Sequence, residues 1–174
     1  LNHCGTTGIP NIDYVLADDI ACPGSDGFYS EKIWRLPGCF FCFDYRAMKT
    51  PPVVEPPCLK NGYITFGAYA RYEKMSDECL KTYAEILRRV PDSKLEMKDN
   101  AYKRPYSIRR VMSLMPDIAP DRLLFSLQTS HPDHMLAYQQ SDLILDVFPH
   151  SGGVVGMEQL YQGCPIVTLY GTQA

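Results

Sequence analysis

The sequence has no excess of charge of one sign and no long apolar run. Its 174 residues include 17 Lys and Arg against 20 Asp and Glu, which gives a net charge of −3. This balance provides no basic surface of the kind that binds nucleic acid. No apolar run approaches the roughly 20 residues that span a bilayer. With 45% hydrophobic residues, the composition predicts a globular protein without nucleic-acid or membrane partners.

Several catalytic signatures are also missing. No Walker lysine follows the glycines, no GxSxG occurs, and no nucleophile–His–acid trio is evident. His131 and His134 form an HxxH pattern, but no third ligand stands at a metal-binding spacing, so we expect no metal site. The sequence starts at Leu1 without an initiator Met or a signal-peptide pattern and stops at Ala174. We expect both ends to lie within a longer protein.

Cysteine is plentiful, but its pattern does not indicate disulfides. Seven cysteines are an odd number, and most are scattered along the chain. They indicate reduced thiols and therefore a cytoplasmic or nuclear protein. Cys39 and Cys42 form a CxxC pattern whose flanks are those of an apolar strand at residues 39–43. We therefore expect these two cysteines to pack in a core rather than to serve redox or zinc chemistry.

A proline-rich stretch separates an irregular first part from a regular second part. Residues 12–17 predict a short strand, and residues 51–57 (PPVVEPP) must be extended because each proline biases its predecessor away from helix. We take this stretch as a linker and expect a domain boundary near Lys60, with domains at residues 1–60 and 61–174.

The second part alternates between strand and helix patterns. Ser76 is a suitable N-cap, and apolar residues recur on one helical face from Leu80 to Val90. The expected strands are residues 63–66, 94–98, 123–126, 143–147 and 166–169, and the expected helices are residues 77–90, 106–115, 132–141 and 154–161. This alternation predicts an α/β fold with a parallel, Rossmann-like sheet that carries helices on both faces.

Ligands of such sheets bind beyond the carboxyl ends of the strands. Residues 67–74, 98–104, 127–134 and 148–153 form the loops at that edge. In residues 143–160 (LILDVFPHSGGVVGMEQL), a buried strand leads through a glycine-containing turn into a helix. The helix start offers unpaired N–H groups and the positive end of the helix dipole, which suit an anion such as a diphosphate.

Charged side chains in these loops are candidate ligand contacts. Arg71, Lys74 and Lys98 could neutralise phosphate, although each taken alone is better explained as a solvated surface cation. Glu158, one turn into the glycine-loop helix, could accept two ribose hydroxyls or simply complement the helix dipole. Asp146 fits a brace for the loop better than a reactive group.

His134 could contact a nucleotide because its loop lies on the ligand side of the sheet. Taken alone, His134 is better explained as a neutral surface or capping histidine.

These motifs together resemble the O-GlcNAc transferase family, and its SPINDLY-like branch most closely. The resemblance rests on DLILDVFP at residues 142–149 with the glycine pair after it, and on EQLYQGCPIVT at residues 158–168. Four shorter matches follow the family's order: residues 6–14, residues 29–32 with 36–37, residues 66–69 with Lys74, and HPDHMLAY at residues 131–138. The resemblance covers nearly the whole chain.

The resemblance implies a GT-B glycosyltransferase, in which two Rossmann-like halves hold a nucleotide sugar. Residues 1–60 would be the end of the N-terminal half and the interdomain segment, and residues 61–174 most of the nucleotide-binding half. Members of the family transfer a sugar from a nucleotide diphosphate to Ser or Thr of proteins, with inversion and without a metal or other cofactor. This chain alone should be inactive, because the acceptor surface and half of the cleft would lie upstream.

The resemblance also implies roles for single residues. Lys74 would stabilise the leaving diphosphate, and Arg71 stands near the phosphates where the family has Gln or Asn. The remaining donor-binding positions would be the base contacts Thr129, His131 and His134, the ribose contact Glu158, and the backbone N–H groups of Gly152, Gly153, Val154, Val155 and Gly156.

The chain also departs from the family pattern at two other places. Val154 and Val155 stand where the family has threonines, so two hydroxyl contacts to phosphate are lost, each worth about 1.5–3 kcal/mol. Ala137 replaces a cation of the animal relatives. We expect UDP-N-acetylglucosamine as the donor, with GDP-fucose or a degenerate binding domain without transfer as alternatives. The oligomeric state stays open.

Overall fold

The computed structural model describes residues 5–24, 26–47 and 50–170, and these belong to two compact units. The smaller unit comprises Leu1–Asp44 and Tyr170–Ala174, and the larger unit comprises Tyr45–Leu169. The division falls before the boundary expected near Lys60. The expectations about both chain ends, and Cys4 with them, lie outside the described residues. Within the described ranges, no helix is long and apolar enough to cross a membrane.

The smaller unit contains two short parallel strands, β1 (Tyr14–Ala17) and β2 (Lys32–Arg35), with a 3-10 turn, η1 (Asp26–Phe28), between them. Asp18 organises the loops around β1, because its carboxylate accepts the N–H groups of Ala21 at 2.7 Å and Phe40 at 2.8 Å. The second strand was not expected from the sequence. Its KIWR pattern is short and lies in a Pro- and Gly-rich region.

The prediction of a strand at residues 39–43 is wrong. The segment has no strand structure, and Cys39 and Cys42 are exposed rather than packed in a core. Phe40 contributes the buried apolar contact instead, against Ala17, Ala21 and Cys22.

The larger unit confirms the predicted alternation of strands and helices. Its five-stranded sheet has the order β5-β4-β3-β6-β7, and all neighbours are parallel. The strands are β3 (Thr65–Ala68), β4 (Lys94–Lys98), β5 (Leu123–Ser126), β6 (Leu143–Leu145) and β7 (Ile166–Val167), and the helices between them are α2 (Asp77–Arg89), α3 (Pro105–Leu114), α4 (His131–Tyr138) and α5 (Val154–Tyr161).

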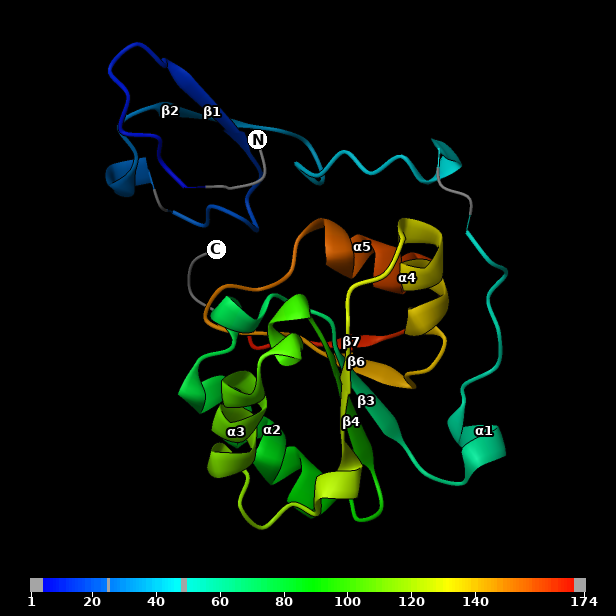
Figure 1. Ribbon diagram of the computed structural model, residues 1–174. Coiled ribbons are helices and arrows are strands. Elements are labelled where there is room, and N and C mark those ends of the chain that lie inside the picture. The colour runs from blue at the N-terminus through cyan, green and yellow to red at the C-terminus, as the bar shows by residue number, and fades with distance from the viewer. Residues whose placement is uncertain (1–4, 25, 48–49, 171–174) are drawn as a thin grey trace. The chain divides into compact units, whose positions relative to one another are not determined.

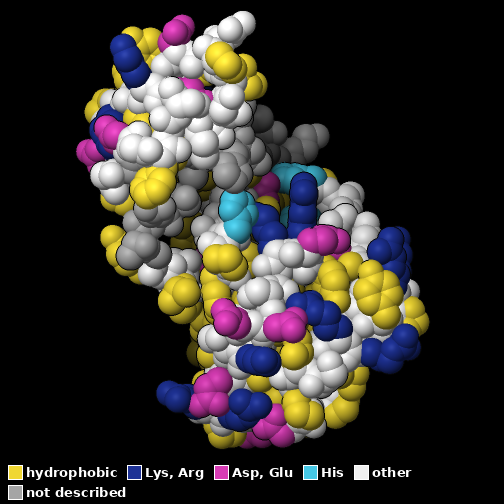
Figure 2. Space-filling view, turned by 90° about the vertical axis from the view of Figure 1, so that its left-hand side faces the viewer, with side chains coloured by type: hydrophobic (Ala, Val, Ile, Leu, Met, Phe, Trp, Pro, Cys, Tyr) yellow, Lys and Arg dark blue, Asp and Glu magenta, His cyan; other side chains and the backbone are white. Residues whose placement is uncertain are grey.

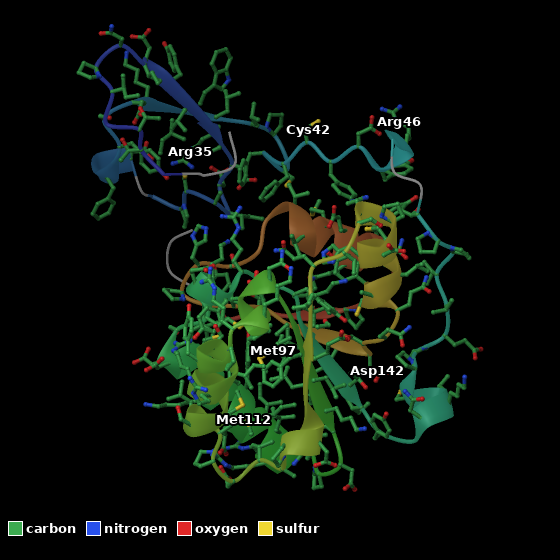
Figure 3. The ribbon with its side chains drawn as sticks, in the orientation of Figure 1. Arg35, Cys42, Arg46, Met97, Met112 and Asp142 are labelled. Atoms are coloured by element: carbon green, nitrogen blue, oxygen red, sulfur yellow. The ribbon has the colours of Figure 1, made fainter. Side chains whose placement is uncertain are left out.

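Helices cover both faces of this sheet, as predicted (Figure 1). On one face, α2 and α3 bury Leu80, Leu87 and Val111 against strand residues that include Met97 of β4, which is labelled in Figure 3. On the other face, α4 packs Met135 and Tyr138 against Ile144 of β6. The connections from β3 and from β6 therefore run to opposite faces.

Local signals explain the ends of α2. The Ser76 Oγ accepts the N–H of Cys79 at 3.1 Å, which confirms the predicted N-cap. At the other end, the Arg122 guanidinium donates to the carbonyls of Leu87 at 2.7 Å and Val90 at 3.1 Å. The last carbonyls of the helix are thus satisfied by a side chain from the 3-10 turn η5 (Pro120–Arg122).

The proline-rich segment leads into a one-turn helix, α1 (Cys58–Asn61), that ends at Gly62 with a φ of 75°. Asp142 ties this turn to the sheet, since its carboxylate accepts the N–H groups of Cys58 and Thr65, both at 2.7 Å. Asp142 lies between β6 and α1 (Figure 3). The segment before α1 belongs to the larger unit because Gln139 donates to the Pro52 carbonyl at 2.8 Å.

Candidate functional site

The order in which the chain adds strands to the sheet reverses between β3 and β6, and the carboxyl ends of these two strands lie at this switch point. The chain leaves β3 toward β4 on one side and leaves β6 toward β7 on the other. Adjacent loops diverge at such a point and leave a crevice for a ligand. A small hollow occupies it, lined mainly by Tyr69, Ala70, Asp146, Val147, Gly152, Val155 and Gly156. Predicted site residues thus meet at the edge that the sequence indicated.

Asp146 holds the loop between β6 and α5. One carboxylate oxygen accepts the N–H groups of Val147 and Gly152, both at 2.9 Å, and the other accepts the Thr168 hydroxyl at 2.9 Å. The Tyr83 hydroxyl, buried under the sheet, donates to the Asp146 carbonyl at 3.0 Å. The bracing role expected for Asp146 is confirmed.

The first turn of α5 contains the predicted anion-binding backbone. Gly153, which has no side chain to cap the helix, is the N-cap. The N–H of Gly156 donates to the Gly153 carbonyl at 2.9 Å, and that of Gly152 is bound by Asp146. In the described part of the chain, no hydrogen bond uses the N–H groups of Gly153, Val154 or Val155. Three of the five expected donors are therefore available to a ligand without rearrangement.

Lys74 comes to this loop from β3. It ends a 3-10 turn, η3 (Tyr72–Lys74), and its Nζ lies 3.4 Å from the Ser151 carbonyl oxygen. The ammonium therefore stands next to the turn that precedes α5. Arg71 precedes η3 and is exposed, and among the described residues its side chain has no ion pair.

His131, His134 and Glu158 form a connected polar cluster between α4 and α5. The Nε2 of His131 lies 3.0 Å from Glu158 Oε1, and the Tyr138 hydroxyl donates to Glu158 Oε2 at 3.1 Å. The same hydroxyl lies 2.8 Å from His134 Nε2. Glu158 is 8% exposed, so both of its oxygens are oriented before any ligand arrives.

The surroundings of His134 favour its neutral form. Burial, and then the positive charge of Lys98, lower the pKa of His134 below its ordinary value. Burial also lowers the pKa of Lys98, whose ammonium donates to the Thr129 hydroxyl at 2.9 Å. Lys98, the last residue of β4, thus positions Thr129 in the loop after β5. The sequence analysis had singled out this lysine only as a possible phosphate contact. Figure 2 shows histidine side chains beside lysine or arginine side chains on one face of the larger unit.

Two tyrosines of the cluster had no role in the sequence analysis. Tyr138 lies four residues after His134, which places both on one face of α4. Tyr69, directly after β3, donates to Glu96 at 2.9 Å and packs edge-on against the ring of Tyr138. The i, i+4 spacing of His134 and Tyr138 was the one signal available in the sequence.

Among the described residues, no group of three or more His, Cys, Asp or Glu side chains could hold a metal ion. The chemistry that these residues offer is electrostatic: N–H groups and a lysine for an anion, and a fixed carboxylate for hydroxyl groups.

Comparison with known proteins decides the family. Residues 57–173 match the family described as Glycosyl transferase family 41. The chain belongs to glycosyl transferase family 41.

Relatives of this family 41 chain match it almost from end to end. It is 35% identical over 99% of its length to SPINDLY of Solanum lycopersicum, described as a probable UDP-N-acetylglucosamine–peptide N-acetylglucosaminyltransferase. It is 30% identical over 95% of its length to SEC of Arabidopsis thaliana, which carries the same description. The chain spans 19% and 18% of the lengths of these two relatives.

Solved structures agree on the fold. A mutant O-GlcNAc transferase of Thermobaculum terrenum matches 98% of this family 41 chain with a TM-score of 0.86 and 28% identity, and the match covers 32% of that protein. Sucrose-phosphate synthase of Thermosynechococcus elongatus matches 91% of the chain and 41% of its own, with a TM-score of 0.63 and 14% identity, which shows likeness of fold alone. The expected GT-B fold, with its Rossmann-like sheet, is confirmed.

Proposed function

We propose that this chain forms the donor-binding part of a protein O-glycosyltransferase. The enzyme would transfer N-acetylglucosamine from UDP-N-acetylglucosamine to Ser or Thr of a protein, with inversion and without a metal. The observation that carries the proposal is the meeting of Lys74 with the start of α5 at the point where the sheet changes direction. The descriptions of SPINDLY and SEC support this donor and a peptide acceptor.

In this proposal, Lys74 and the first turn of α5 stabilise the departing nucleotide. Negative charge builds up on the diphosphate as its bond to the sugar breaks. The ammonium and the N–H groups of Gly153, Val154 and Val155 are fixed before the reaction, so they can offset that charge without reorganising. Arg71, exposed one turn earlier, adds positive charge at the same edge.

Glu158 takes the ribose, with Thr129, His131 and His134 near the base. Both Glu158 oxygens already accept one hydrogen bond each. A carboxylate has about four acceptor positions, so two ribose hydroxyls can still be accommodated. The carboxylate is held by protein groups, and little side-chain freedom is lost when the ribose binds.

The valine pair supports a second candidate, a domain that binds nucleotide or a partner protein without transfer. Val154 is 41% exposed at the first turn of α5 and offers no hydroxyl.

GDP-fucose is the alternative donor, which the SPINDLY-like pattern keeps open. The family pattern further assigns residues 1–60 to the end of the N-terminal half and the interdomain segment. The free cysteines of the described residues support a cytoplasmic or nuclear location.

Calorimetry on the full-length protein tests the donor. We expect binding of UDP and UDP-N-acetylglucosamine, whereas preference for GDP would identify GDP-fucose as the donor. Binding of neither nucleotide would contradict the whole proposal. Nucleotide binding without transfer to any protein acceptor would favour the second candidate.

Lys74→Gln tests the catalytic assignment, with Lys81→Gln as the matched control because Lys81 is an exposed lysine of α2. Transfer by Lys74→Gln should fall at least about a hundredfold, which corresponds to loss of one preorganised charge contact. Lys81→Gln should retain full activity. Equal activity of both variants would remove Lys74 from the mechanism.

A further inference from the structure

Tyr138 joins His134 to Glu158. Its side chain is fully buried, and its hydroxyl lies 2.8 Å from His134 Nε2 and 3.1 Å from Glu158 Oε2. The ring cannot move away from this position easily, because Tyr69 packs edge-on against it with a centroid distance of 5.2 Å. A single phenol group therefore has to satisfy a histidine nitrogen and a carboxylate at once.

Counting protons fixes the direction of both hydrogen bonds. A tyrosine hydroxyl has one proton, and a carboxylate can only accept. The hydroxyl therefore donates to Glu158 Oε2, and its oxygen is left as an acceptor for His134. His134 must then carry its proton on Nε2. Burial, and then the charge of Glu158, raise the pKa of Tyr138, so the phenol keeps its proton at neutral pH.

We infer that Tyr138 is a positioning residue that locks neutral His134 in its Nε2–H tautomer and so leaves Nδ1 as a hydrogen-bond acceptor for the donor substrate. The inference rests on the proposed function for the identity of that substrate, a nucleoside diphosphate sugar. In the described part of the chain, no hydrogen bond uses Nδ1 of His134. An acceptor at this position suits an N–H of the base or a hydroxyl of the ribose.

The same proton that fixes His134 also fixes Glu158. Without the Tyr138 hydroxyl, Oε2 would lose its protein donor, while His131 would still hold Oε1 at 3.0 Å. Tyr138 thus prepares two ligand contacts at once, a neutral acceptor nitrogen and an oriented carboxylate. The phenol itself would act through both groups without touching the substrate.

The tautomer can be measured on the ligand-free chain. The sequence has four histidines, so ¹⁵N-histidine labelling gives a small number of signals, and His134→Gln identifies those of His134. Above the pH range in which histidine is protonated, we expect the Nε2 of His134 to give the signal of a protonated ring nitrogen and Nδ1 that of an unprotonated one. The opposite assignment in the unaltered chain would overturn the inference, whether or not any variant folds.

Tyr138→Phe tests the consequence for binding, with Tyr106→Phe as the control because Tyr106 is exposed on α3. In Tyr138→Phe, the His134 signals should become those of a mixture of tautomers, and the affinity of the full-length protein for UDP should fall about tenfold, as expected for one lost hydrogen bond. Tyr106→Phe should change neither. An unchanged tautomer in folded Tyr138→Phe would refute the positioning role.

The two experiments separate a failure of the proposed function from a failure of the inference about Tyr138. Absence of nucleotide binding by the unaltered protein would contradict the function, while the tautomer of His134 would still decide the inference about Tyr138.

Discussion

A methyl group added at Gly67 should destabilise the sheet at the centre of the site. Gly67 lies in β3, where its neighbours leave no room for a side chain. A Cβ there would come within 2.6 Å of Tyr69 Cε2, 2.7 Å of Ile144 Cδ1 and 2.7 Å of Ser141 Oγ. All three distances are well below van der Waals contact, so Gly67→Ala forces several packed groups to move together.

The cost can be worked out from the contacts. Overpacking of a well-packed core costs about 1–3 kcal/mol. For a chain of this size, that loss lowers the melting temperature by roughly 2–12 °C. The Tyr69 side chain has little freedom to give way, because its hydroxyl donates to Glu96 at 2.9 Å and lies 2.9 Å from the Ser141 hydroxyl oxygen. We therefore expect the upper part of this range.

Gly156→Ala provides the matched control. A Cβ at Gly156 meets only Ile166 Cδ1 at 3.6 Å, which is ordinary contact, and the residue lies within α5. Replacing a helical glycine with alanine should stabilise the protein by about 0.5–1 kcal/mol. Urea and thermal unfolding followed by circular dichroism would compare both variants with the parent. Gly67→Ala as stable as the parent would refute the packing argument.

Three further changes test other parts of the structure. Asp142→Ala should lower the free energy of unfolding by about 2–4 kcal/mol, because two backbone donors lose a charged acceptor, and Asp142→Asn should cost less; urea unfolding would measure both. Val154→Thr with Val155→Thr should tighten UDP binding at least about tenfold in calorimetry, and unchanged affinity would mean that the added hydroxyls do not reach the phosphates. The lowered pKa of His134 means that the unfolded chain binds more protons between that pKa and about 6.5, so stability should fall as the pH is lowered through this window. His134→Gln should flatten this slope in unfolding measurements at a series of pH values, and an unaltered slope would assign it to other groups.

The sequence predicted the larger unit well because its signals were redundant. The start of α2 was marked both by Ser76 and by the apolar face from Leu80 onward, and the structure begins the helix at Asp77. Strand ends were less certain: β3 begins at Thr65, two residues after the expected start at residue 63, because no cap marks the end of a strand. The edge that carries the candidate site followed from strand order alone.

The smaller unit shows where such signals fail. Residues 39–43 are as apolar as a strand, but apolar character does not specify a partner, and Phe40 and Phe41 instead pack against each other with a centroid distance of 4.4 Å. In the site, the hydrogen bonds that join Tyr138 to His134 and Glu158 depend on how α4 and α5 pack. Tyr138 is close in sequence to His134 but not to Glu158, so the cluster as a whole could not be predicted.

The short seam between β3 and β6 has a consequence for dynamics. The two strands pair only through Phe66 with Leu143 and Gly67 with Ile144, whereas β3 and β4 pair over four positions. A diphosphate bound as proposed would touch Lys74 from one side of this seam and α5 from the other. It would hold the two strands together. Amide hydrogens between β3 and β6 would then exchange with solvent more slowly in the bound protein. One of them is the Asp142 N–H, which donates to the Thr65 carbonyl at 2.8 Å. This short pairing is thus one that the ligand would reinforce.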